Sequence, residues 1–130
     1  MSNIPRDVPT KTIIVVDDDF GILQLLKEGL GGAGYRVIPA YGGDDAVSKV
    51  KAYKADVLVT DLAMTRVSGV EVIQRIRDDP ETRKIAVIVV TAHVWDGLAQ
   101  AAGQVGYDAC ITKPFTTKQL LSTIRQCLDR

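Results

Sequence analysis

The chain has 130 residues, 46% of them hydrophobic and 25% charged, so its composition is that of one globular domain and excludes a disordered chain. Sixteen basic residues balance sixteen acidic ones without forming a basic cluster, which argues against nucleic acid or an anionic membrane surface as the partner. The longest apolar run, Ile85 to Val90, is too short to span a membrane, and two distant cysteines suit a reducing compartment, so we expect a cytoplasmic protein.

Apolar runs and amphipathic segments alternate five times after a polar stretch, residues 1–11, that we predict to be a flexible tail. The predicted strands are 12–16, 35–38, 57–60, 85–90 and 109–111. The predicted helices are about 22–30, 44–53, 70–79, 95–104 and 116–128. Strands and helices that alternate at this spacing are typical of right-handed βαβ units, so the sequence predicts an α/β fold with one parallel sheet.

The character of each apolar run predicts its place in that sheet. The first, third and fourth runs are continuously apolar, which indicates strands buried on both faces. The second run is short and is followed by Pro39, so we expect an edge strand that Pro39 closes. After the third run, Ser68 and Glu71 form a capping-box pattern that can start the next helix. Asp61 is then not needed as a helix cap and is free for another role.

Polar residues stand at the carboxyl ends of four predicted strands: Asp17 with Asp18, Asp61, Thr91, and Lys113. Because parallel strands end at one edge of a sheet, we expect these side chains to converge. Two carboxylates about 4 Å apart repel by about 4 kcal/mol at an effective dielectric near 20. Three carboxylates and one ammonium sum to a charge of −2, which a divalent cation would neutralise, and oxygen ligands favour Mg²⁺. A metal, an ammonium and a hydroxyl around one carboxylate indicate phosphoryl transfer.

These residues, in this order, resemble the receiver domain of two-component response regulators, of the single-domain type found in chemotaxis regulators. The resemblance covers about residues 12–128 and is carried by Asp17-Asp18, Asp61 with Met64 and Gly69, Thr91-Ala92, and Lys113-Pro114-Phe115. It implies one receiver domain over residues 12–130. The implied fold is flavodoxin-like, a doubly wound (βα)5 arrangement whose five-stranded parallel sheet has the order 2-1-3-4-5.

The resemblance also implies a role for each site residue. Asp61 would be the phosphoacceptor, and Mg²⁺ would be the cofactor. Asp18, Asp61 and the backbone carbonyl of Ala63 would bind the ion, while Asp17 would hold water bound to it. Thr91 would bond the phosphoryl oxygens and Lys113 would pair with them.

The function that follows from the resemblance is signalling rather than enzymatic turnover. The phosphoryl donor would be a histidine kinase or a histidine phosphotransfer protein, and the phosphorylated chain would contact a downstream protein that the sequence does not name. The chain ends at Arg130, soon after the last predicted helix, so we expect a free-standing receiver, although a piece of a longer regulator would look the same.

Three positions depart from the family pattern. Thr65 replaces a usual proline, Ser68 replaces a common aspartate, and Cys110 stands where an aromatic side chain usually rotates on activation. Because Cys110 has no ring, we hypothesise that the loop after Thr91, which carries Trp95, reports the phosphorylated state instead.

Two other functions compete with this interpretation. Asp17 and Asp19 form an Asp-x-Asp motif like that of haloacid-dehalogenase-type phosphatases, with Asp17 as nucleophile. Those enzymes also need a later acidic pair, which the sequence after Lys113 does not supply. The second alternative is a receiver-like binding module that is never phosphorylated. Such a module would have no reason to keep the mutually repelling acids.

Overall fold

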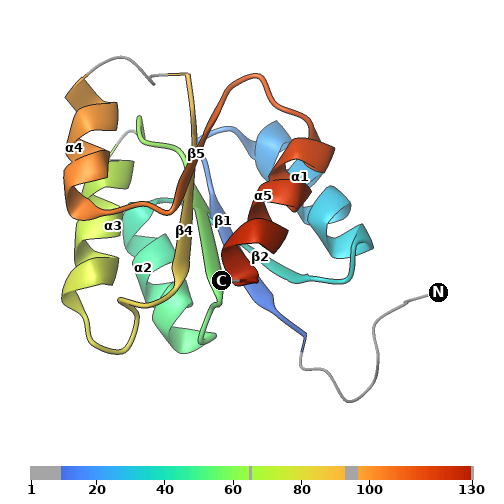
Figure 1. The fold of residues 1–130 in the computed structure, drawn as a ribbon, viewed down its shortest axis with the longest axis horizontal. Helices are drawn as coiled ribbons and strands as arrows, with labels where there is room; N and C mark the ends of the chain where they lie inside the picture. Colours follow the sequence, from blue (N-terminus) through green and yellow to red (C-terminus); the bar gives the residue numbers. More distant parts are fainter. Residues whose placement is uncertain (1–9, 65, 93–96, 130) are drawn as a thin grey trace.

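The computed structural model describes residues 10–64, 66–92 and 97–129. Five parallel strands form one sheet in the order β2-β1-β3-β4-β5, which confirms the predicted fold (Figure 1). The strands are β1 (Thr12–Val16), β2 (Arg36–Ala40), β3 (Val57–Thr60), β4 (Ala86–Thr91) and β5 (Ala109–Thr112). The helices are α1 (Phe20–Gly32), α2 (Gly43–Ala52), α3 (Gly69–Asp78), α4 (Gly97–Val105) and α5 (Thr117–Leu128).

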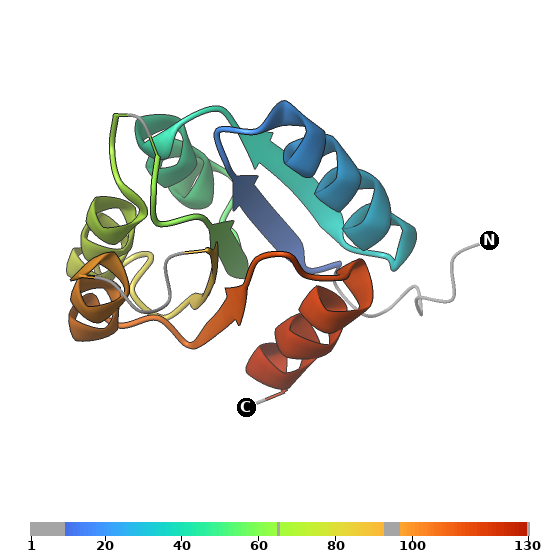
Figure 2. The same cartoon turned by 90° about the horizontal axis from the view of Figure 1, so that it is seen from above.

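Helices cover both faces of the sheet. Helices α1 and α5 lie on one face, and α2, α3 and α4 lie on the other (Figures 1 and 2). Two apolar clusters fill the spaces between the layers, one on each face. All residues of β1 and β3 are buried, as predicted for strands covered on both sides. No helix of the described residues is long and apolar enough to span a membrane.

Pro39 lies inside β2, and the prediction that it closes this strand was wrong. The strand continues to Ala40, and Pro39 is paired with Val15 of β1. The amide of Arg36 donates to the carbonyl of Lys11, so the amide of every second residue after Arg36 points toward β1. The main-chain nitrogen of Pro39 therefore points away from β1. Because β2 is an edge strand, as predicted, the missing amide of Pro39 removes no hydrogen bond within the sheet.

Helix α1 also differs in detail from the prediction. Its buried residues Leu23, Leu26 and Leu30 form one stripe, but Leu25, which shares the apolar spacing in the sequence, is 58% exposed. The helix continues through its glycine-rich end to Gly32.

Some predicted segments lie outside the described residues. Of the predicted tail, only residues 10 and 11 are described. The predicted start of the fourth helix, which includes Trp95, and Thr65 are not among the described residues.

Arg77 of α3 clamps the end of the sheet opposite the predicted site. Its guanidinium donates to the carbonyl oxygens of Gly106 (2.9 Å) and Ile85 (2.8 Å). It also contacts the Asp108 carboxylate at 3.0 Å, and that carboxylate accepts from the amide of Val87 at 2.7 Å. The Arg77 side chain is only 20% exposed, so these bonds are partly shielded from water. One side chain thus joins α3 to the starts of β4 and β5.

We expect Arg77→Ala to lower the free energy of unfolding by about 3 kcal/mol, because it removes the cationic partner of a partly buried carboxylate and the donor to several carbonyl groups. Urea unfolding followed by circular dichroism measures the loss. Arg75→Ala on the same helix is the matched control, since Arg75 forms its ion pairs with Asp44 and Glu71 at the surface. Equal losses from the two substitutions would contradict the clamp.

Candidate functional site

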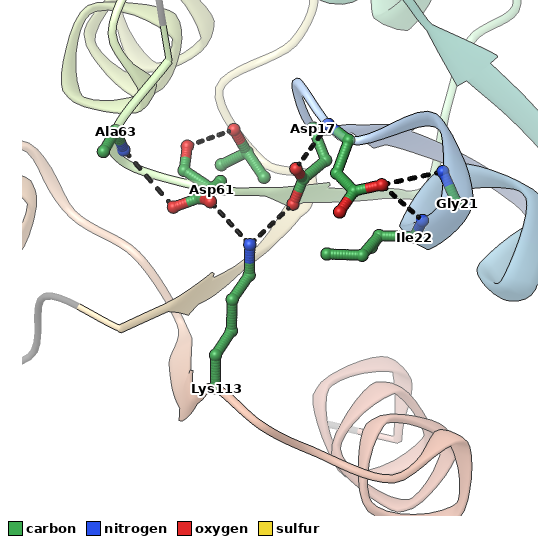
Figure 3. Close-up of polar contacts among 8 residues, drawn as sticks. Asp17, Gly21, Ile22, Asp61, Ala63 and Lys113 are labelled. Carbon is green, nitrogen blue, oxygen red and sulfur yellow. Dashed lines mark hydrogen bonds and ion pairs between the residues drawn. The ribbon is translucent and has the colours of Figure 1, made fainter.

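Three charged side chains from three strands meet at the carboxyl edge of the sheet. The Nζ atom of Lys113, after β5, lies 2.8 Å from Oδ2 of Asp17, after β1, and 2.7 Å from Oδ2 of Asp61, after β3 (Figure 3). Asp17 is 7% exposed and Asp61 is 9% exposed. The sequence predicted this convergence, and the parallel register of the strands produces it.

Charge balance explains why Lys113 lies between the two acids. Burial opposes the charged form of its ammonium group, but the hydrogen bonds and attraction to Asp17 and Asp61 outweigh that effect and raise the pKa of Lys113. Two partly buried carboxylates without this ammonium would repel each other at low effective dielectric. Lys113 therefore offsets the repulsion between the two acids and holds them together.

The three consecutive acids after β1 have three different environments. Asp17 is buried, and its Oδ1 accepts from the amide of Asp19 at 3.0 Å, whereas Asp18 is exposed. Asp19 is the N-cap of α1, and its carboxylate accepts from the amides of Gly21 (2.8 Å) and Ile22 (3.3 Å). The phosphatase alternative needs Asp19 as a second catalytic acid, but this side chain is used to start a helix.

Asp61 is fixed by its own neighbours in the chain. The amide of Ala63 donates to Oδ1 of Asp61 at 3.3 Å, and the buried Thr60 hydroxyl donates to the main-chain carbonyl of Asp61 at 2.8 Å. Ser68 caps α3 through the amide of Glu71, as predicted, so Asp61 takes no part in capping. Thr60 was not predicted as part of the site, although a hydroxyl at the end of an aliphatic strand is a signal that could have found it.

Gly69 allows the β3–α3 loop, described for residues 61–64 and 66–68, to turn back on itself. The amide of Gly69 donates to the carbonyl of Leu62 at 2.9 Å. A Cβ atom at Gly69 would overlap the carbonyl oxygen of Asp61 and would lie 2.7 Å from Cα of Leu62. Because those are main-chain atoms, no side-chain rotation could relieve the contact. The first residue of α3 must be glycine if Asp61 is to stay where it is.

The remaining predicted residues lie along β4 and β5. Thr91 is fully buried, and its carbonyl accepts from the amide of Lys113 at 2.9 Å, which joins the ends of the two strands. The peptide bond between Lys113 and Pro114 is cis. Cys110 is half-buried against the core on the α2–α4 face, and burial raises the pKa of its thiol. Cys110 also lines an open groove of about 710 Å³ along β5 and α5.

The oxygen atoms at this edge fit a small hard cation. Among the described residues, no three acidic, histidine or cysteine side chains are already arranged as a metal centre. Mg²⁺ does not require such a centre, because it keeps several waters and binds proteins through one or two carboxylates together with phosphate oxygens. Asp17 and Asp61 converge, with exposed Asp18 next in the chain, so the donor set is of the type that Mg²⁺ prefers.

Comparison with known proteins agrees with this geometry. A family model described as the response regulator receiver domain matches residues 13–125. The chain is 31% identical over 119 residues to the polar-differentiation response regulator DivK of Brucella ovis, a match that covers 92% of this chain and 97% of that protein. The chain therefore belongs to the response regulator receiver family, whose members are signalling phosphoacceptors and not enzymes that turn over a separate substrate. Membership implies a histidine kinase as partner.

Solved structures show the same fold. The chemotaxis protein CheY4 of Vibrio cholerae is 26% identical, with a TM-score of 0.86 over 92% of this chain and 99% of that one. The receiver domain of a sensor histidine kinase from Pseudomonas aeruginosa is 22% identical, with a TM-score of 0.86 over 94% of this chain and 100% of that one. That second receiver holds a magnesium ion in its active site cleft.

We expect Gly69→Ala to lower the free energy of unfolding by about 3 kcal/mol, because the added methyl group overlaps main-chain atoms that cannot move apart. Thermal and urea unfolding measure the change. Gly32→Ala is the matched control, since a Cβ atom there would meet no atom within 4 Å. A Gly69→Ala protein as stable as the control would show that the loop tolerates a side chain at this position.

The ion pairs of Lys113 also predict a pH dependence. Because its pKa is raised above the ordinary value of 10.5, their contribution to stability is complete below that pH and is lost as the pH rises above it. The difference in unfolding free energy between the wild-type protein and Lys113→Met should therefore be constant near neutral pH and shrink at alkaline pH. Urea titrations across this range test it, with Lys27→Met, at an exposed position on α1, as the control. A difference that grows with pH would reverse the assignment.

Proposed function

We propose that Asp61 accepts a phosphoryl group from a phosphohistidine of a histidine kinase or of a histidine phosphotransfer protein. The observation that carries the proposal is that the Lys113 ammonium group forms ion pairs with the carboxylates of both Asp61 and Asp17. In the reaction a carboxylate oxygen of Asp61 forms a bond to phosphorus while the bond from phosphorus to the imidazole nitrogen breaks. The imidazole leaves with the electron pair of that bond.

The other residues of the edge have supporting roles in this proposal. Lys113 and the Thr91 hydroxyl would contact the phosphoryl oxygens, whose charge grows on transfer. Asp18, Asp61 and the carbonyl of Ala63 would hold Mg²⁺, with Asp17 holding a water bound to it. When bound, the ion would supply positive charge to the transferred group. Catalysis would then consist mainly of positioning and charge stabilisation.

The signal would leave the site through contact with a protein. Phosphorylation adds about one negative charge to Asp61, together with three strong acceptor oxygens. The balanced net charge of the chain favours a protein partner over nucleic acid. Since Cys110 is too small to act as the rotating aromatic switch, the hypothesis that the loop after Thr91 reports the phosphorylated state is kept.

Incubation with acetyl phosphate and Mg²⁺ should add the mass of one phosphoryl group, because Asp61 is the only acceptor. Intact-protein mass spectrometry measures the shift, which should vanish in Asp61→Asn and on chelation of the metal. Asp19→Asn is the matched control, because asparagine caps a helix as well as aspartate does and the phosphoryl group should still be taken up. A phosphoryl group on Asp17, or none under any condition, would contradict the proposal and favour one of the two alternatives.

A further inference from the structure

The β3–α3 loop has a second close contact, with the first residue of α2. Gly43 begins α2 and is buried. A Cβ atom at Gly43 would lie 2.5 Å from Cβ of Val67, 2.7 Å from its Cγ1 and 2.9 Å from its carbonyl oxygen. Carbon atoms pack at about 3.5–4.0 Å, so α2 approaches the loop this closely only because residue 43 has no side chain. The contact borders a cleft of about 190 Å³ that reaches Asp18.

Val67 has little freedom to move away from Gly43. Two of the three nearest atoms are Cβ and the main-chain oxygen, and the χ1 angle of a β-branched valine is stiff. The Val67 side chain also packs against the core on the α2–α4 face. Two residues further along, Gly69 packs so closely against the main chain of Asp61 and Leu62 that no side chain would fit between them. A displacement of Val67 is therefore passed to the end of the loop that carries Asp61.

Helix α2 is equally well held on its side of the contact. The carboxylate of Asp45 accepts from the amide of Tyr41 at 2.9 Å, and the carbonyl of Gly42 accepts from the amide of Ala46 at 2.9 Å. Ala46 and Val50 anchor the helix in the core, where both are buried. Because neither side has free space to yield into, an atom added at the start of α2 would strain the loop at Val67 as well as the helix.

We propose that Gly43 is a positioning residue for phosphotransfer, because it lets α2 hold Val67 and, through Val67, the loop that carries Asp61 and Ala63. This inference rests on the proposed role of Asp61. Gly43 contributes no polar side chain to the site, so its effect is purely geometric. A reacting group displaced by about 1 Å can lose about a hundredfold in rate.

The test compares Gly43→Ala with the wild-type protein in two measurements. The rate constant for phosphorylation by acetyl phosphate should fall by about ten- to a hundredfold. Hydrogen exchange of the amides of Leu62, Ala63 and Gly69, measured by NMR without phosphate or metal, should become faster. Val67→Gly removes the two nearest of the three atoms that the new methyl group would meet and leaves only the main-chain oxygen, so the double variant should phosphorylate faster than Gly43→Ala alone.

Two further glycines provide matched controls. Gly31→Ala adds a methyl group in open space and should change neither measurement. Gly29→Ala places a Cβ atom 2.6 Å from Cγ2 of Thr117, between α1 and α5, so it should lower stability but leave the phosphorylation rate unchanged. If Gly43→Ala behaves like Gly29→Ala, with normal rate and exchange, the positioning role is overturned.

The design separates this inference from the proposed function. A wild-type chain that takes up no phosphoryl group would overturn the role of Asp61, while the exchange measurement would still report on the loop. If Gly43→Ala does not fold, Val67→Ala serves as the second variant, since it removes the Cγ1 contact without adding bulk. It should speed exchange of the same amides and slow phosphorylation, and wild-type values for both would count against the inference.

Discussion

The ammonium group of Lys113 lies between carboxylates that belong to two other strands, and the arrangement of the whole carboxyl edge depends on this contact. A parallel sheet brings the ends of all its strands to one edge, so acids that follow buried strands are forced together at the margin of the core. Their repulsion would be costly where water is partly excluded. A single lysine just after the edge strand β5 offsets it, while leaving the cluster negative enough to attract a divalent cation.

The position of Asp61 depends on two glycines, whose lack of a side chain lets other segments approach closely, as well as on hydrogen bonds. Gly69 leaves room for the main chain of Asp61 on one side of the β3–α3 loop, and Gly43 leaves room for Val67 on the other. The hydroxyl of Thr60, the last residue of β3, donates a hydrogen bond to the main-chain carbonyl of Asp61. Such a loop is fixed by close contact between main-chain segments, which permits little adjustment. Geometry at the site is therefore sensitive to changes at residues that never touch the reacting atoms.

The two ends of the sheet are stabilised in different ways. At the amino end, Arg77 and Asp108 satisfy main-chain groups of β4 and the α4–β5 turn, and Asp56 accepts from the amide of Thr12 at 2.8 Å. In the described part of the chain, no buried side-chain nitrogen or oxygen lacks a hydrogen-bond partner. Charges at the amino end are thus paired for stability. At the carboxyl end Lys113 pairs with both Asp17 and Asp61, and exposed Asp18 is next in the chain, so that edge keeps an excess of negative charge that gives it its chemistry.

The sequence by itself determined the order of strands and helices, the burial of the central strands, and the residues that meet at the carboxyl edge. These depend on local periodicity and on the rule that parallel strands end together, so they can be read without coordinates. Only the tertiary structure decided that Pro39 sits inside β2, that Leu25 is exposed, and that Asp19 rather than its neighbours caps α1. The Arg77 clamp and the contact between Gly43 and Val67 were also invisible in the sequence. Each depends on how closely elements distant in the chain approach one another, and that distance is set by the packing of the whole core.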